Sequence, residues 1–107
     1  MLAKLRPDVS RIVEGARSCH EAGASAVGEG RSGGLSGPAI APVALRCVAE
    51  VHRSLPDLPT IGCGGVHDLR SANAYLDAGA TSVQVGTALL HDPTTVARLR
   101  ADLQEIR

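Results

Sequence analysis

Aromatic side chains are almost missing from this 107-residue sequence, which has no Trp, no Phe and a single Tyr, Tyr75. Charge of either sign is also not in excess, because 11 Lys and Arg residues balance 11 Asp and Glu residues. A nucleic-acid-binding protein usually presents a basic surface and aromatic stacking platforms. The composition therefore argues against nucleic acid and against an anionic membrane surface as partners.

Long apolar runs and paired cysteines are absent as well. No stretch approaches the roughly 20 apolar residues of a membrane-spanning helix, and the first residues do not read as a signal peptide. The cysteines Cys19, Cys47 and Cys63 are odd in number and form no Cys-x-x-Cys pair. We therefore expect a reduced, cytoplasmic protein with neither a disulfide framework nor a metal site.

The sequence does contain short apolar runs that alternate with amphipathic stretches. Four helix starts are predicted from capping residues and from proline at a first helical position: Asp8, Pro42, Asp68 and Asp92. Strands are predicted at residues 1–5, 24–27, 60–63 and 81–85. These runs do not alternate between apolar and polar residues, which is typical of parallel strands covered on both faces. The pattern predicts an α/β fold of up to four βα units in a single domain, residues 1–107.

An internal echo supports a repeating architecture. Residues 21–27 and 77–83 share the form acidic-Ala-Gly-Ala-hydroxyl-x-Val, two βα units apart. Such repetition is expected in a β/α barrel or in a doubly wound sheet. A complete (β/α)8 barrel needs about 250 residues, so a barrel-derived chain of this length would be a half-barrel with two unpaired edge strands.

Three glycine-rich segments are the strongest candidates for a binding site: residues 33–39, 62–65 and 86–88. Glycine lets backbone N–H groups approach an anion closely, and a helix N-terminus adds a favourable dipole. The last two segments follow the last two predicted strands, where many barrels bind phosphate. One such loop is adequately explained as a tight turn, but three together favour phosphate binding.

Other polar residues give weaker signals. Lys4 lies near the end of the first predicted strand, although a lone lysine near a terminus is usually solvated. Cys63 reads as a small buried thiol, since no base is adjacent to it in the sequence. The four histidines have no metal-ligand spacing, although two of them fall in strand-end loops: His67 and His91. A solvated helix face is predicted from four charged residues: Arg98, Arg100, Asp102 and Glu105.

Taken together, these segments resemble the C-terminal part of the dihydroorotate dehydrogenase family, class 1 in particular. The resemblance is carried in order by residues 4–9, 33–46, 59–65 and 78–88, and it spans nearly the whole chain. It implies the C-terminal half of a TIM (β/α)8 barrel that binds FMN and oxidises dihydroorotate to orotate in pyrimidine biosynthesis. The related barrel of dihydropyrimidine dehydrogenase matches the same segments less well and is the alternative enzyme.

The resemblance also assigns cofactor-binding residues. Lys4 matches the lysine that contacts the flavin ring system in the family. Five further positions match contacts to the FMN phosphate and ribityl chain: Gly37, Gly64, Gly65, Gly86 and Thr87. In the family, an Asn-Thr or Asn-Ser pair that holds orotate follows the second strand, and here Arg31-Ser32 stands in its place. Ser32 keeps at most a hydroxyl contact to substrate, because Arg31 cannot replace an amide that both donates and accepts.

The family's catalytic base and most of its substrate-binding asparagines lie in the N-terminal barrel half, so no catalytic residue is assigned to this chain. Three interpretations remain open: a half that pairs with another chain to form the enzyme, a non-catalytic FMN- or phosphate-binding module, and a truncated gene remnant. FMN, with dihydroorotate or orotate, is the expected ligand. A half-barrel exposes two strand edges, so we also expect a homo-oligomer or pairing with a missing N-terminal half.

Overall fold

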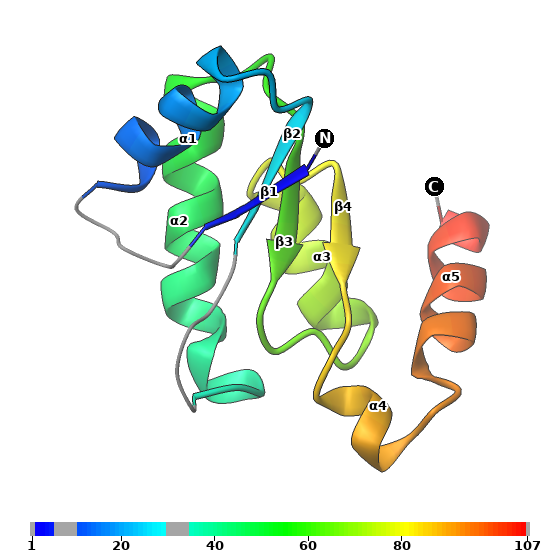
Figure 1. Cartoon of the computed structure of the whole chain (residues 1–107). Helices are drawn as coiled ribbons and strands as arrows, with labels where there is room; N and C mark the ends of the chain where they lie inside the picture. The colour runs from blue at the N-terminus through cyan, green and yellow to red at the C-terminus, as the bar shows by residue number, and fades with distance from the viewer. Residues whose placement is uncertain (1, 6–10, 30–34, 107) are drawn as a thin grey trace.

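The computed structural model describes residues 2–5, 11–29 and 35–106 (Figure 1). Four parallel strands form one sheet in chain order, β1-β2-β3-β4. Their bounds are Leu2–Leu5 for β1, Ala26–Glu29 for β2, Thr60–Cys63 for β3 and Ser82–Gln84 for β4. The parallel α/β architecture predicted from the sequence is confirmed.

Helices connect the strands and continue beyond the last one. They are α1 (Ile12–Glu21), the short 3₁₀ helix η1 (Pro38–Ile40), α2 (Ala41–Ser54), α3 (Leu69–Asp77), α4 (Ala88–His91) and α5 (Thr95–Ile106). In Figure 1, α3 lies behind β3 and β4, and α5 stands beyond β4 at the edge of the molecule. No helix in the described part of the chain is long and apolar enough to cross a membrane.

The core is centred on the single aromatic side chain. Tyr75 of α3 is fully buried, and it packs in one cluster with Ala44, Val48, Val66, Ala72, Ala80 and Leu99. A Cβ on Gly62 of β3 would lie 2.7 Å from the Tyr75 Cγ, so only glycine allows strand and ring to approach this closely. A second cluster joins α1 to α2 through Ile12, Ala16, Cys47, Val51 and Leu58. The fold thus replaces aromatic bulk with close backbone packing.

Several predicted boundaries shift in the structure. The predicted cap Asp8 lies outside the described residues, and α1 begins at Ile12. The second strand begins at Ala26 and not at Ala24, because Ala24 still belongs to the turn after α1. The Ala24 N–H donates a hydrogen bond to the Cys19 carbonyl oxygen in that turn. Pro42 does lie in the first turn of α2. The short helix α4 was not predicted, since it is only four residues long and ends directly before the turn at Asp92.

The predicted cap at Asp68 is confirmed. Its carboxylate accepts a hydrogen bond from the Ser71 N–H at 2.8 Å, and the Ser71 hydroxyl accepts one from the Asp68 N–H at 3.0 Å. These hydrogen bonds lower the pKa of Asp68 below its ordinary value of 3.8. The Asp68 carboxylate thus occupies the Ser71 N–H and places a negative charge at the N-terminus of α3.

Replacing Asp68 with Ala should lower the free energy of unfolding by about 1 kcal/mol at neutral pH, the usual cost of losing an N-cap. Because the folded pKa is lowered, the ionised cap stabilises the fold above pH 3.8, and this contribution is lost as the pH falls through the folded pKa. Urea titrations at pH 7 and at pH 3 measure the difference. Asp57→Ala, in the exposed loop after α2, is the control. An equal effect of Asp68→Ala at both pH values would contradict the prediction.

Candidate functional site

A pocket of about 310 Å³ lies at the carboxyl ends of β3 and β4. The loop after each strand forms a wall, and further walls come from the turn before η1 and from the start of α5. The described residues that line it include the five predicted phosphate- and ribityl-contacting positions: Gly37, Gly64, Gly65, Gly86 and Thr87. The structure therefore brings together segments that are far apart in the sequence.

Two of these glycines are required by the way the loops pack. Gly65 has a φ of +75°, and a Cβ there would lie 2.9 Å from both the Gly37 carbonyl oxygen and the Pro38 Cα. Gly64 has a φ of +137°, and a Cβ there would lie 3.1 Å from Ile40 Cγ2. Since L side chains rarely adopt such φ values, these glycines are explained by the fold alone.

Gly86 is different. Its φ is outside the left-handed region, and a Cβ there would meet nothing within 4 Å among the residues considered. Neither backbone conformation nor packing in the described chain demands a glycine at this position. Open space beside a glycine on a pocket wall is what close approach of a ligand to the backbone requires.

Hydrogen-bond donors are available next to Gly86. The carbonyl oxygens of Gly86 and Thr87 accept bonds from the N–H groups of Leu89 and Leu90, whereas the Thr87 hydroxyl makes no capping bond. Within the described part of the chain, no acceptor is found for the N–H groups of Thr87 and Ala88. The β4–α4 loop can therefore donate to an anionic ligand.

Charged groups also reach the pocket. The Arg98 Nη1 lies 2.7 Å from Asp92 Oδ2, and both residues are in the lining. The hydroxyl of Thr94 donates to Asp92 Oδ1 at 2.6 Å, and the Thr94 N–H donates to the same atom at 2.9 Å. These bonds, followed by the one from Arg98, lower the pKa of Asp92, so this carboxylate is ionised at neutral pH.

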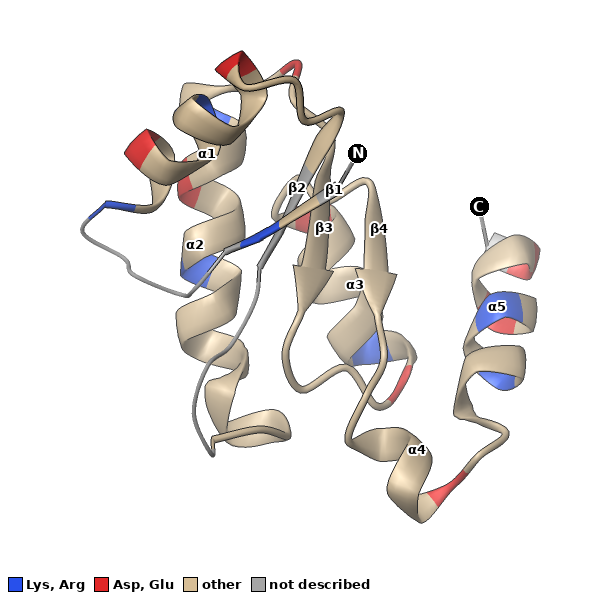
Figure 2. Ribbon diagram, viewed as in Figure 1, with Lys and Arg blue, Asp and Glu red and all other residues tan. Residues whose placement is uncertain are grey.

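This placement adds to one prediction. Arg98 is exposed on α5, as expected for the solvated face predicted with Arg100, Asp102 and Glu105, and it also lines the pocket. Periodicity along α5 did not reveal this, because it does not show that the start of this helix, together with the turn at Asp92, forms a wall of the pocket. Figure 2 shows Lys and Arg positions interspersed with Asp and Glu positions along the described part of the ribbon.

The two histidines of the strand-end loops and Cys63 also belong to the lining. His67 Nδ1 lies 2.8 Å from the Gly65 carbonyl oxygen, which ties the imidazole to the β3–α3 loop. Cys63 is buried, as predicted. Among the described residues, no group of three or more His, Cys, Asp or Glu side chains is arranged to hold a metal ion.

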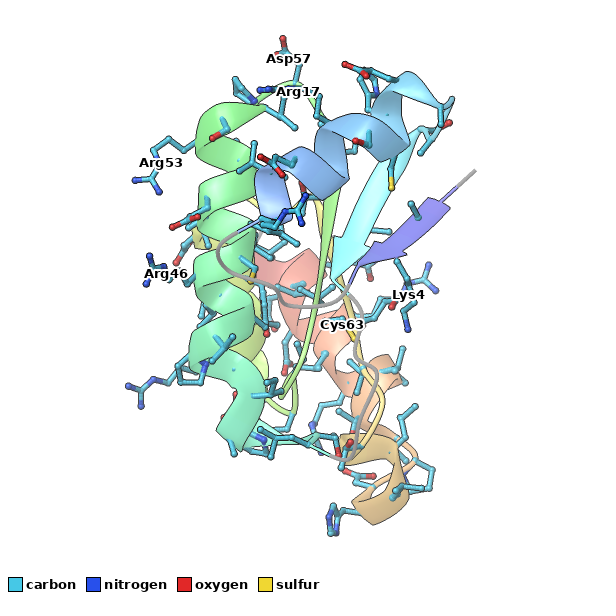
Figure 3. All side chains as sticks on the ribbon, turned by 60° about the vertical axis from the view of Figure 1, so that its left-hand side comes forward. Lys4, Arg17, Arg46, Arg53, Asp57 and Cys63 are labelled. Carbon is cyan, nitrogen blue, oxygen red and sulfur yellow. The ribbon has the colours of Figure 1, made fainter. Side chains whose placement is uncertain are left out.

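Lys4 is not among the residues that line the pocket, but it lies on the same face of the sheet as Cys63, which does line it. Strand pairing connects Lys4 to Gly28, Gly28 to Ile61 and Ile61 to Ser82. Paired residues of parallel strands share a face, and residues two apart on a strand do so as well. Cys63, two residues beyond Ile61, is therefore on the Lys4 face (Figure 3).

Two of the residues singled out in the sequence cannot be placed. Ser32, the weak substrate-contact candidate, and its neighbour Arg31 lie outside the described residues. Tyr75, by contrast, had no predicted role at the site. Its hydroxyl donates to the Gly64 carbonyl oxygen at 2.5 Å, which connects the core to the pocket wall. The only signal in the sequence was that Tyr75 is the sole aromatic residue.

Comparisons with known proteins identify the family of the chain. The family model described as dihydroorotate dehydrogenase matches residues 9–106. The catalytic subunit of dihydroorotate dehydrogenase B (NAD(+)) from Methanothermobacter thermautotrophicus is 46% identical over 83% of this chain and 36% of its own length. The corresponding subunit from Petrotoga mobilis is 40% identical over 98% of this chain and 41% of its own length.

A solved structure shows the same fold. The crystal structure of DHODH from Eimeria tenella, in complex with ferulenol, superposes with a TM-score of 0.84 at 22% identity, over 98% of this chain and 33% of that chain. This match confirms that the four parallel βα units are part of a TIM barrel. The chain spans about two fifths of the length of the curated relatives it matches. On the family model and these relatives, the chain belongs to the dihydroorotate dehydrogenase family.

Proposed function

We propose that this chain is the flavin-phosphate-binding half of a dihydroorotate dehydrogenase barrel and that its ligand is FMN. The observation that carries the proposal is the pocket at the ends of β3 and β4, with open space at Gly86 and free donors at Thr87. A phosphate needs backbone N–H groups that it can approach closely, and this wall supplies them. Residues 1–107 form one such unit.

The described residues fit FMN in their distribution as well as in their chemistry. Thr87, Gly86 and the Gly64-Gly65 loop form the phosphate end, while Lys4 lies on the same sheet face as Cys63, where a ring system extending from the pocket would lie. When bound, FMN supplies the hydride acceptor for oxidation of dihydroorotate to orotate, a step of pyrimidine biosynthesis in the cytoplasm. This chain's part is to bind and orient the flavin.

Two alternatives make different predictions. A non-catalytic module would use the same pocket for FMN or phosphate without any substrate chemistry. A dihydropyrimidine dehydrogenase-like enzyme would share the flavin site but act on another pyrimidine. The names of the relatives favour dihydroorotate as the substrate of the complete barrel.

Calorimetry with FMN and riboflavin tests the proposed ligand directly, because the two differ only in the phosphate. FMN should bind at least ten-fold more tightly, which corresponds to the roughly 1.5–3 kcal/mol of a charge-assisted hydrogen bond. Inorganic phosphate should compete with FMN. Equal affinity for FMN and riboflavin would reject the phosphate site.

We also propose that a second copy of the chain completes the barrel. An apolar groove of about 660 Å³ separates β4 from α5, and its walls include Leu76, Val83, Val85, Val96, Leu99 and Leu103. Within the described chain, β4 pairs only with β3 and β1 only with β2. Because all strands are parallel and in chain order, a half-turn about the barrel axis brings β1 of each copy beside β4 of the other. In Figure 1, α5 stands beyond β4, the position from which each α5 would cover the new seam in such a dimer.

Light scattering at micromolar concentration should therefore show a dimer. Val96→Glu should shift the chain to monomer, since Val96 lines the groove and is already 48% exposed, so the substitution spares the core. Leu90→Glu, 86% exposed on α4 and outside the groove, is the matched control and should remain dimeric. A monodisperse monomer for the unsubstituted chain would contradict self-pairing, and would leave a separate N-terminal barrel half as the partner.

A further inference from the structure

We infer that Arg98 is a second, side-chain ligand of the flavin phosphate, held at the pocket by Asp92. The inference rests on the proposed function and deepens it. It adds a cationic side chain from α5 to a site that the sequence described only in terms of glycine loops.

The geometry fixes where the guanidinium is held. Asp92 Oδ2 accepts a hydrogen bond from Arg98 Nη1 at 2.7 Å, while Asp92 Oδ1 accepts hydrogen bonds from the hydroxyl and the N–H of Thr94. The Asp92 carbonyl oxygen accepts the Thr95 hydroxyl at 2.6 Å, and Thr95 is buried. Thr94 thus fixes the carboxylate and Thr95 fixes the backbone that carries it, so that Oδ2 is presented to Arg98. Asp92, Thr95 and Arg98 all line the pocket.

The chemistry of the pair suits a phosphate. Guanidinium has five N–H donors in a planar fork, and the bond to Asp92 is made through Nη1, so donors remain for a second oxyanion. Arg98 also neutralises Asp92, whose charge would otherwise repel a phosphate in the same pocket. His67 and His91 are the other titratable nitrogen groups of the lining. Arg98 therefore converts an acidic wall into one that accepts an anion.

A purely structural role explains the pair poorly. The Arg98 and Asp92 side chains are 50% and 40% exposed, and exposed ion pairs contribute little to stability. The turn before α5 is already fixed by Thr94 and Thr95. What the pair does accomplish is to hold an arginine beside the loop of Gly86 and Thr87.

Arg98→Gln tests the inference, with Arg100→Gln as the matched control. Both remove one positive charge from an exposed position of α5, but Arg100 faces the β4–α5 groove and not the pocket. Calorimetry should show FMN affinity about ten- to a hundred-fold weaker in Arg98→Gln, with riboflavin affinity unchanged. Arg100→Gln should leave both affinities unchanged. Arg98→Lys should recover part of the FMN affinity, because a point charge replaces the fork.

The outcomes separate this inference from the proposed function. If Arg98→Gln retains the full preference for FMN while Gly86→Val loses it, the phosphate site stands and Arg98 is not a ligand. If Arg100→Gln weakens FMN as much as Arg98→Gln does, the effect is one of net charge and the inference is wrong. If the unsubstituted chain does not distinguish FMN from riboflavin, the proposed function itself fails. Thermal unfolding of each variant verifies that the fold is intact.

Discussion

Gly86→Val should abolish the preference of this chain for FMN over riboflavin without unfolding it. The position has an ordinary backbone conformation, and a Cβ there would meet nothing within 4 Å among the residues considered, so the fold does not require glycine. The same side chain would stand beside the N–H groups of Thr87 and Ala88, where the phosphate has to approach. FMN affinity should fall by at least ten-fold, to that of riboflavin, as measured by calorimetry on the two ligands.

Gly64→Val shows why the choice of glycine matters. Its φ of +137° and the atoms of Ile40, Ala44 and Tyr75 near a Cβ make this substitution a folding defect, with the ligand preference lost for that reason. Circular dichroism and urea unfolding distinguish the two variants. If Gly86→Val keeps its fold and still prefers FMN, the phosphate does not bind at the β4–α4 loop.

The elements that the sequence predicted best have strong local signals. The strand at 60–63 is observed with the same bounds, and Asp68 caps the next helix as expected. Both are determined by residues close in sequence: an apolar run between breakers, and a carboxylate three residues before its N–H partner. The start of β2 and the helix α4 were not predicted, because they depend on how a turn closes against its neighbours.

The site was predictable in its position and not in its detail. Loops that follow adjacent parallel strands necessarily meet at one sheet edge, so the glycine segments could be grouped from the sequence. Which glycine serves the fold and which leaves space for a ligand depends on contacts such as that of Gly65 with Pro38. The position of Arg98 at the pocket depends likewise on its ion pair with Asp92. Sequence periodicity predicts neither the contact of Gly65 with Pro38 nor this ion pair.

Tyr75 is expected to be the most costly side chain to remove. It is fully buried at the centre of the main cluster, and no other aromatic residue exists in the sequence to fill the space. Truncation of a buried aromatic residue to Ala typically costs about 3–5 kcal/mol, because a cavity remains. Urea unfolding of Tyr75→Ala should show a loss of this size, and Leu90→Ala, at an 86% exposed position, should show none.

Tyr75→Phe isolates the connection between this core and the site. The ring is kept, but the Gly64 carbonyl oxygen, which accepts the hydroxyl at 2.5 Å, loses that donor inside the protein. An unsatisfied buried acceptor costs about 1–3 kcal/mol. Because Gly64 lines the pocket, its loop should also be held less firmly, and FMN should bind more weakly than to the unsubstituted chain. If Tyr75→Phe unfolds at the same urea concentration and binds FMN equally well, the hydroxyl positions nothing, and the glycine loop is held by the packing of Gly65 against Gly37 and Pro38.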